Sequence, residues 1–504
     1  MRRTLVAGSV VLGLLAAPAY ADTPEPSSPQ TPSVAQAPAS FGGEAIVYSN
    51  YLSDTISWAA LNGGASGTLN TTGATVSGPW GVALDPARNK VWWANYDSNT
   101  IGSANLDGTG AGADLPTGAA PFGDIYGFAL DPVAGVVYWA NYGSSTIGYA
   151  RTDGSGGGTF NTGTATMNGP CGVAVDRAAG RLYWGNFDGD TISYANLSGD
   201  GGGSGDLATT GATVAAPCGV AVDRSAGRIW WTNADTSSIS SASTAGGSGA
   251  DLDMTGASAD AYYGLALDPA AGRVWWPGYN NGISSAALSG GGGSDLMSSA
   301  DLVYPSYPAL LDKPVAAGAA AVTGGSTVGT RLTCTSSWAG DLVESFYFRS
   351  PSTTTTSWTR NGQPVPGATA ATLTATQPGS YTCARTASNP AGSATATSPS
   401  FTVKPVGVTL GKARRNQATG TAKLKVTVTS PCQIRVSGKG VKTLSKTATR
   451  AGVFQLVVKA SGKAKRKLKA TGAVTVKVTV TCTPSDGTAT TKSKKVTLKR
   501  ASAR

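Results

Sequence analysis

The chain has 504 residues, of which 40% are hydrophobic and 13% charged, with 68 glycines, 27 prolines and no histidine. This length and composition favour several all-β domains over a single large core. The absence of histidine excludes serine triads of the usual kind and zinc sites with imidazole ligands, and it removes the commonest general base.

The formal net charge of +11 is distributed unevenly along the chain. Residues 22–312 hold 8 Lys and Arg against 25 Asp and Glu, whereas residues 406–504 hold 23 Lys and Arg against one acidic residue, Asp486. The sequence therefore predicts an acidic part joined to a strongly basic one. A basic part of this kind attracts anionic polymers through a field that salt weakens.

The N-terminus has the pattern of a secretory signal. Two arginines precede an apolar run at residues 5–17, and small residues follow at 19–21. We predict a signal peptide at 1–21 and an exported protein without a transmembrane segment, because the apolar run is too short to span a bilayer. Residues 22–43 are rich in Pro, Ser and Ala and are predicted to form a disordered leader.

Residues 44–312 contain a repeat of 44 to 47 residues, typified by GVAVDRAAGRLYWGNFDGDTISYA at 172–195. Each unit predicts four antiparallel strands, and its aspartate is expected to accept backbone hydrogen bonds in the turn after the first strand. A period near 45 residues is typical of a propeller blade. Five copies are complete and a sixth is split between residues 47–56 and 308–312, which predicts a closed six-bladed β-propeller. The repeated aspartates are Asp85, Asp131, Asp176, Asp223, Asp268 and Asp312.

The second strand of each unit carries a family resemblance. The segments at 92–95 (WWAN), 138–141 (YWAN), 183–186 (YWGN) and 230–233 (WWTN) resemble the Tyr-Trp-Thr-Asp (YWTD) repeat of the low-density lipoprotein receptor class B family. The resemblance covers residues 44–312 and implies a six-bladed propeller that binds protein ligands outside cells. This chain departs from the family pattern, because Asn replaces the family's Asp and residues 275–278 (WWPG) lack the amide as well.

Two further β domains are predicted after the propeller. Residues 314–404 resemble an immunoglobulin-like domain, with Trp358 between Cys334 and Cys383 and with Tyr381 at the place of a tyrosine corner. Residues 406–504 alternate apolar and cationic residues with period two, which predicts a β-sandwich with a basic wet face. This segment resembles a lysine-rich C-terminal module of actinobacterial secreted proteins.

Six cysteines in an exported chain favour disulfides. The immunoglobulin resemblance pairs Cys334 with Cys383, and the shared inward phase of Cys432 and Cys482 allows a second bridge. Cys171 and Cys218 occupy equivalent positions in neighbouring blades, just before the innermost strand. We expect them to form a bridge worth about 4 kcal/mol on the chain-entropy model, the alternative being two buried thiols.

Aromatic residues recur at two repeat positions that should emerge on one face of the propeller. This face is predicted to bind sugars, cationic groups or a peptide, with a rim formed by Asp54, Asp97, Asp188, Asp190 and Asp235. The alternative is that the rings only pack between blades. The residues that enter the inner strands are Trp80, Tyr126, Cys171, Cys218, Tyr263 and Tyr307, and those that follow the blade Asn are Tyr51, Tyr96, Tyr142, Phe187 and Tyr279, with Ala234 as the exception.

We expect a secreted binding or adhesion protein with an extracellular protein or glycan as partner. The basic run Lys463, Lys465, Arg466, Lys467 and Lys469 is a candidate for binding anionic envelope polymers, or else a solvated face that keeps the protein soluble. It lacks the interleaved aromatics that stack nucleic-acid bases. No catalytic residue, metal ligand set or cofactor motif is found, so no enzyme is predicted. The rival hypotheses are a propeller hydrolase or lyase and a purely structural envelope protein, and the oligomeric state is left open.

Overall fold

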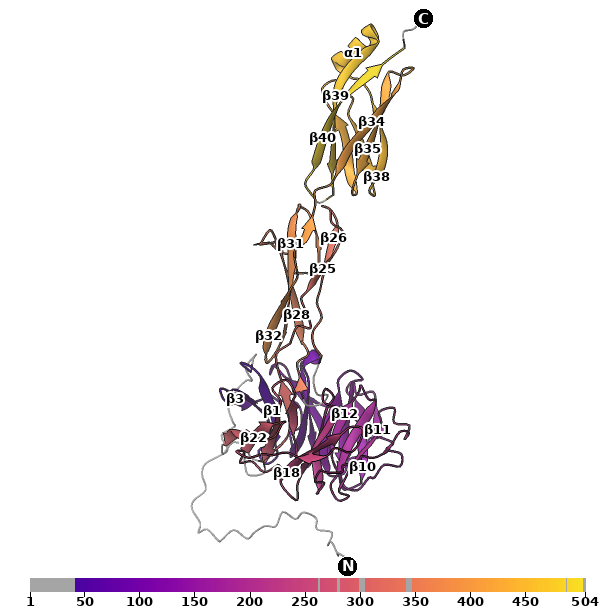
Figure 1. Ribbon diagram of the computed structural model, residues 1–504. Helices are drawn as coiled ribbons and strands as arrows, with labels where there is room; N and C mark the ends of the chain where they lie inside the picture. Colours follow the sequence, from indigo (N-terminus) through magenta and orange to yellow (C-terminus); the bar gives the residue numbers. More distant parts are fainter. Residues whose placement is uncertain are drawn as a thin grey trace, which may run out of the picture. The chain divides into compact units, whose positions relative to one another are not determined.

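The computed structural model describes residues 41–261, 263–278, 282–298, 304–340, 347–485 and 487–501 (Figure 1). These residues are nearly all β-structure, as predicted. The described part contains a single α-helix, α1 (Gly462–Thr471), and one 3-10 turn at Pro86–Arg88. The predicted signal peptide and most of the predicted leader lie outside the described residues.

Residues 45–311 form six sheets that follow one another as propeller blades. In five of them four consecutive strands pair antiparallel in chain order, and the first strands of neighbouring sheets contact one another. The all-β prediction and the blade-like repeat are thus confirmed. The strands of these five sheets are β4 (Pro79–Asp85), β5 (Lys90–Asn95), β6 (Thr100–Asn105) and β7 (Ala113–Asp114); β8 (Ile125–Asp131), β9 (Val136–Asn141), β10 (Thr146–Arg151) and β11 (Gly157–Thr159); β12 (Pro170–Asp176), β13 (Arg181–Asn186), β14 (Thr191–Asn196) and β15 (Gly205–Asp206); β16 (Pro217–Asp223), β17 (Arg228–Asn233), β18 (Ser238–Ser243) and β19 (Ala250–Asp251); and β20 (Ala266–Asp268), β21 (Arg273–Gly278), β22 (Gly282–Ala287) and β23 (Ser294–Ser298).

The second tryptophan of each complete repeat holds its blade together. Each of these indoles is fully buried and donates its N–H to a main-chain carbonyl 17 or 18 residues earlier, at distances of 2.8–3.0 Å. The bond fastens the loop that enters the blade to the blade's second strand, and the ring fills the space between sheets. The tryptophans are Trp93, Trp139, Trp184, Trp231 and Trp276.

The asparagine that ends the second strand of the repeat has a structural role. Asn95 accepts a hydrogen bond from Ser77 N at 3.0 Å and donates to Thr100 Oγ1 at 2.9 Å, which ties both ends of the turn after β5 to the entering loop. Asn186 and Asn233 make equivalent bonds. The predicted turn role of the repeated aspartates is also confirmed in five repeats, where Oδ1 accepts the N–H three residues later, at Asp85, Asp131, Asp176, Asp223 and Asp268.

The sixth sheet contains both ends of the repeat region. In it β24 (Pro305–Leu311) pairs antiparallel with β1 (Ala45–Asn50), and β2 (Thr55–Ala60) and β3 (Ser66–Thr68) follow. This is the split copy that the sequence predicted. The structure adds a fifth strand, β27 (Tyr347–Phe348), which comes from the segment after the propeller and pairs parallel with β24. The sequence did not predict β27.

Residues 321–403 form two sheets that the Cys334–Cys383 disulfide joins. Trp358 is buried beside this bridge, and Tyr381 donates its hydroxyl to Gln377 O at 2.8 Å, which is the contact that the predicted tyrosine corner requires. The two sheets contain β25 (Ala321–Gly324), β26 (Arg331–Thr335) and β30 (Thr372–Thr374); and β28 (Thr353–Arg360), β29 (Gln363–Pro364), β31 (Gly379–Asn389), β32 (Gly392–Thr397) and β33 (Phe401–Val403).

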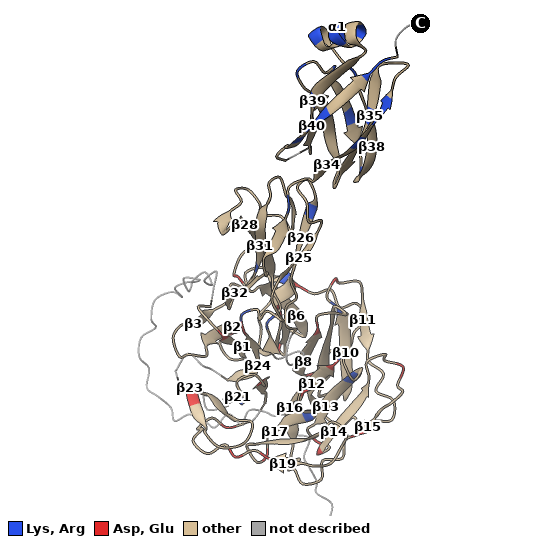
Figure 2. Ribbon diagram, turned by 45° about the horizontal axis from the view of Figure 1, so that its top comes forward, with Lys and Arg blue, Asp and Glu red and all other residues tan. Residues whose placement is uncertain are grey.

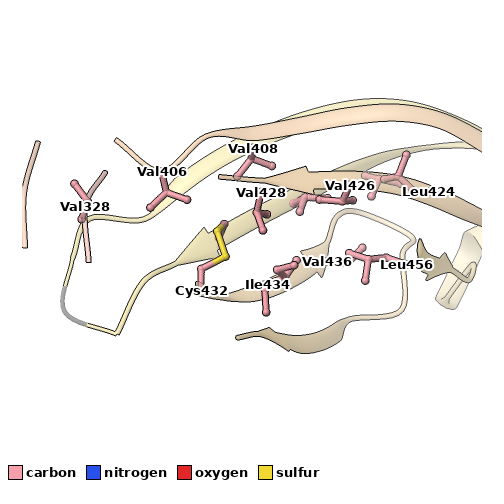
Figure 3. Close-up of a cluster of buried hydrophobic side chains, with 14 of the residues drawn as sticks. Val328, Val406, Val408, Leu424, Val426, Val428, Cys432, Ile434, Val436 and Leu456 are labelled. Atoms are coloured by element: carbon pink, nitrogen blue, oxygen red, sulfur yellow. A yellow bond between two sulfur atoms is a disulfide. The ribbon is translucent and has the colours of Figure 1, made fainter. Parts of the chain in front are cut away.

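Residues 408–499 form two more sheets, and Cys432 and Cys482 are bridged as predicted. The helix α1 interrupts the β pattern at the basic run and was not predicted. One buried apolar cluster includes Val328 as well as Val406 and the valines of these sheets (Figure 3). The strands are β34 (Val408–Asn416), β35 (Thr421–Val428) and β38 (Gly452–Val458); and β36 (Cys432–Ser437), β37 (Leu444–Ala448), β39 (Ala473–Thr483) and β40 (Thr490–Lys499).

Candidate ligand-binding face

The described aromatic residues of the candidate site form one cluster, which we call the aromatic face. Its outer members lie in the turns between the second and third strands, and its inner members lie at or near the start of the innermost strands. Tyr279 lies outside the described residues. The outer members are Tyr51, Tyr96, Tyr142 and Phe187, and the inner members are Trp80, Tyr126, Tyr263 and Tyr307.

Main-chain hydrogen bonds place the outer rings above the inner ones. In each blade the outer aromatic residue donates its N–H to a carbonyl just before that blade's first strand. The bonds are Tyr96 N to Gly78 O at 2.9 Å, Tyr142 N to Asp124 O at 3.0 Å and Phe187 N to Gly169 O at 2.8 Å. Because the same bond recurs from blade to blade, the repeat itself builds a curved row of rings.

The rings contact one another in an unbroken chain. The Trp80 ring lies 4.9 Å from Tyr51, 5.2 Å from Tyr126 and 5.0 Å from Tyr263, all edge-on. Tyr126 lies 5.5 Å from Tyr96 and 5.3 Å from Tyr142, and Tyr142 lies 6.0 Å from Phe187. The rings thus form an arc over four consecutive blades, and Ala234 ends it at the next blade.

The inner members differ in what they offer a ligand. Tyr307 is 1% exposed and Trp80 is 8% exposed, whereas Tyr126 and Tyr263 are half-buried. The Tyr307 hydroxyl lies 2.8 Å from Cys218 Sγ and 3.2 Å from Cys171 Sγ, and these two cysteines form the predicted disulfide. Tyr307 and the disulfide therefore support the arc from below, and the half-buried outer rings supply its surface.

Carboxylates accompany the tyrosines at three successive blade junctions. Tyr51 donates its hydroxyl to Asp97 Oδ1 at 3.2 Å, and Tyr142 donates to Asp188 Oδ1 at 3.1 Å. At the intervening junction Tyr96 lies beside Asp124. Each pair joins a tyrosine of one blade to an aspartate of the next, so the acidic groups are held at the edge of the rings.

The sequence prediction did not include Asp124. Gly143 stands where the neighbouring blades have Asp97 and Asp188, and the Asp124 carboxylate lies where a Gly143 side chain would be. The sequence does contain a signal for Asp124. The turn after the second strand of this blade lacks the aspartate that its neighbours have, and the loop before the first strand of the same blade carries an aspartate instead. Only the folded chain shows that the two positions meet.

The tyrosines remain neutral near physiological pH. Burial, together with the Asp97 carboxylate, raises the pKa of the Tyr51 phenol to about 12. Burial and the hydrogen bond to Asp188 raise the pKa of Tyr142 to about 12, and burial also raises the pKa of Tyr96. The charge of the aromatic face therefore comes from its aspartates.

Two glycines leave room for the Asp97 and Asp188 carboxylates beside the main chain. Gly78 and Gly169 have φ angles of +56° and +59°. A Cβ atom at these positions would lie 2.6 Å from Asp97 Oδ2 and 2.7 Å from Asp188 Oδ2, respectively. Any larger residue would displace the tyrosine–aspartate pair, so both positions need glycine.

The basic residues of the propeller lie at one end of its strands, whereas aspartates lie at both ends. Seven aspartates are exposed in the loops around the aromatic face, namely Asp54, Asp97, Asp124, Asp188, Asp190, Asp235 and Asp260. The eight basic residues of 41–312 lie at the opposite strand ends, namely Arg88, Lys90, Arg151, Arg177, Arg181, Arg224, Arg228 and Arg273. No basic residue occurs in the loops of the aromatic face.

One polar group of the aromatic face is left over. The indole N–H of Trp80 is buried and has no hydrogen-bond partner among the described residues, although its ring contacts four tyrosines. Buried donors in folded proteins are nearly always paired. The N–H is covered, and four other indole N–H groups of the propeller are buried without a described partner in the same way, those of Trp58, Trp92, Trp230 and Trp275.

The predicted polyanion site is exposed. Lys463, Lys465, Arg466, Lys467 and Lys469 all lie on α1 and are exposed, and α1 is the most strongly basic element in Figure 2. In the described ranges no three His, Cys, Asp or Glu side chains are grouped so as to hold a metal ion. No helix of the described part is long and apolar enough to cross a membrane.

Neither a family model nor a curated protein matches this chain. Among solved structures, one in a nidogen/laminin complex shares 18% identity with a TM-score of 0.44, covering 53% of this chain and 98% of its own. A putative 6-phosphogluconolactonase from Bacteroides uniformis shares 15% identity, TM-score 0.36, covering 49% of this chain and 79% of its own. A functionally unknown protein from Desulfotomaculum acetoxidans shares 12% identity, TM-score 0.36, covering 53% and 98%.

Proposed function

We propose that the chain is a secreted, non-catalytic binding protein that holds an extracellular protein or glycan on the aromatic face, while residues 406–504 associate with anionic envelope polymers. The observation that carries the proposal is the unbroken arc of half-buried rings. Rings that only filled space between blades would be covered, as Trp93 and Trp139 are, whereas the outer rings keep part of their surface in solvent.

The physical basis of binding is the chemistry of the rings and their fixed positions. Tyrosine offers a large apolar area and a hydroxyl at little cost in side-chain entropy, which is why it is enriched at interfaces. Here the hydroxyls of Tyr51 and Tyr142 are fixed by aspartates, and the backbone of each turn is fixed by a hydrogen bond to a carbonyl just before the first strand of the same blade. A ligand would thus meet a surface that is already ordered. The three disulfides fit the oxidising compartment in which such a protein would act.

The test is binding of the full chain to an array of glycans and extracellular proteins. We expect a specific signal that Tyr96→Leu and Tyr142→Leu each reduce about tenfold or more, because a central aromatic residue of an interface contributes about 2 kcal/mol. The matched control is Tyr149→Leu, which changes a half-buried tyrosine of β10 outside the aromatic face.

Two results would contradict the proposal. A blank array would remove the evidence for a binding function, and a signal that all three variants reduce equally would place the site elsewhere. Turnover of an array compound that the Tyr variants leave unchanged would favour the hydrolase or lyase hypothesis.

A further inference from the structure

We propose that the ligand of the aromatic face is a cationic polypeptide segment, whose lysine or arginine side chains lie on the tyrosine rings beside Asp97, Asp124 and Asp188. This inference rests on the proposed function and gives its ligand a chemical class. The proposed occupant is a polypeptide other than this chain. Binding of a neutral glycan and binding of a second copy of this chain are the alternative results of the test.

The aromatic face is negatively charged. The loops around the aromatic face hold seven exposed aspartates and no basic residue, so no internal cation neutralises the face. Arg88 and Arg177 form ion pairs with the turn aspartates Asp85 and Asp131, at the opposite strand ends. A cationic segment would therefore be both attracted to this face and oriented toward it.

Tyrosine rings of the aromatic face are paired with carboxylates. An ammonium or guanidinium group above a tyrosine ring is attracted by the negative face of the ring, and a carboxylate at the ring edge adds a charge-assisted hydrogen bond. The structure repeats this combination at three blade junctions, as Tyr51 with Asp97, Tyr96 with Asp124 and Tyr142 with Asp188. Tyr51 and Tyr142 donate neutral hydroxyls to Asp97 and Asp188, so the charge of each carboxylate is not compensated by these bonds.

A cationic peptide and a neutral sugar differ in what they offer the ring–carboxylate pairs. The ammonium or guanidinium groups of a peptide can match each pair in both charge and hydrogen bonding. A neutral sugar carries no such group, so it would leave the carboxylates without a partner of opposite charge.

The experiment measures binding of a fluorescent peptide of about ten residues, alternating Lys and Ala with blocked ends, to the full chain by fluorescence anisotropy. The matched probes are the same peptide with every lysine acetylated and the same peptide with Glu in place of Lys. We expect binding of the lysine peptide only, weakening as NaCl rises from about 50 to about 500 mM.

Substitutions then locate the site. Asp97→Asn with Asp188→Asn keeps an acceptor for each tyrosine hydroxyl and removes two charges, and it should weaken the lysine peptide about tenfold or more. The control, Asp153→Asn with Asp200→Asn, removes two charges from exposed aspartates at the opposite strand ends and should change binding less than about twofold. Tyr96→Phe should retain binding and Tyr96→Leu should lose it, because the ring face is what contacts the cation.

Three outcomes would overturn this inference. Equal losses in the two double variants would assign binding to the overall charge of the propeller. Self-association of the chain that Asp97→Asn with Asp188→Asn abolishes would make the basic segment of a second copy the occupant. If the lysine peptide does not bind but a neutral glycan does, and Tyr96→Leu abolishes the glycan binding, this inference fails and the proposed function stands. If neither the peptide nor any glycan binds, the inference and the proposed function both fail.

Discussion

Trp92 and Trp93 are neighbours in β5, and both are buried, but their indole N–H groups differ. Trp93 is fully buried and donates to Thr75 O at 2.8 Å, whereas Trp92 is 7% exposed and its N–H has no partner among the described residues. Replacing either ring by Phe removes a similar volume. Only Trp93→Phe also removes an indole hydrogen bond, which contributes about 0.5–1.5 kcal/mol, and leaves Thr75 O with Asn95 Nδ2 as its remaining donor at 3.0 Å.

We therefore predict that Trp93→Phe lowers the unfolding temperature of the propeller more than Trp92→Phe does. Calorimetry of the full chain would measure both variants against the unchanged protein, since the propeller should give a transition of its own. Equal decreases would mean that the indole hydrogen bond contributes nothing beyond ring packing.

At the scale of elements, β27 joins the propeller to the β region that follows. Its pairing with β24 is accompanied by a bond from Asp312 N to Phe348 O at 2.8 Å, and the Tyr347 hydroxyl lies 3.3 Å from Glu44 Oε1 and 3.2 Å from Asp312 Oδ2. Burial and the nearby Asp268 and Asp312 carboxylates raise the pKa of Glu44 to about 7. Burial also raises the pKa of Asp268.

This cluster predicts a pH dependence of stability. The Glu44 pKa is higher in the folded chain than its ordinary value of about 4.3, so the folded state binds the proton more tightly. The stability that this gives is complete below about pH 4 and is lost as the pH rises to about 7, with little further change above. Between about pH 5 and pH 8 the propeller transition should therefore move to lower temperature.

Glu44→Gln, which imitates the protonated side chain, should reduce this dependence and stabilise the protein at about pH 8 by about 1 kcal/mol, a value discounted for the partial exposure of Glu44. Thermal unfolding at the two pH values would measure it. Asp235→Asn, at an exposed aspartate away from β27, serves as the control. An unchanged pH dependence in Glu44→Gln would assign the effect to other carboxyl groups.

The strands of the blades could be predicted from the sequence because the residues that determine each strand are close together in the chain. The second strand that the sequence places around residues 183–186 is observed as Arg181–Asn186, and the repeat register brought Cys171 and Cys218 together. β27 could not be predicted, since two residues show no period and their partner lies in another part of the chain. The helix α1 was not predicted because the period-two pattern on both sides of it favours strands, although Lys, Ala, Leu and Arg favour helix and Gly472 ends α1 in the left-handed region.

The candidate site was predictable to the same extent. The two aromatic positions follow from the repeat, and the structure brings all of their described members into one cluster. What the sequence could not provide was which rings remain accessible. Tyr126 and Tyr307 occupy the same repeat position, yet one is half-buried and the other fully covered beside the disulfide. Burial depends on what neighbouring blades place above each ring.

At the scale of the whole molecule, the proposed binding of anionic polymers can be tested through α1. We predict that Lys463→Gln, Lys465→Gln and Lys467→Gln together lower the NaCl concentration at which the full chain leaves an immobilised polyanion, because three exposed charges of one helix are removed. The matched control changes three exposed lysines of the strands, Lys423, Lys425 and Lys477, in the same way.

A larger decrease for the α1 variant than for the strand variant would make the helix the contact surface. Equal decreases would show that the whole basic segment acts as a diffuse cation. Retention that neither triple variant changes would count against polymer binding and in favour of a solubilising role.

The seam between β24 and β1 also has a mechanical consequence. β24 begins beside the aromatic face and ends at Leu311, from which the chain continues toward the basic segment. A ligand held on that face and a polymer held by the basic segment would pull β24 along its own axis. Because antiparallel ladder bonds run across the strands, such tension loads the bonds to β1 together, in shear, and not one after another. The split blade is therefore the joint that would resist flow or traction.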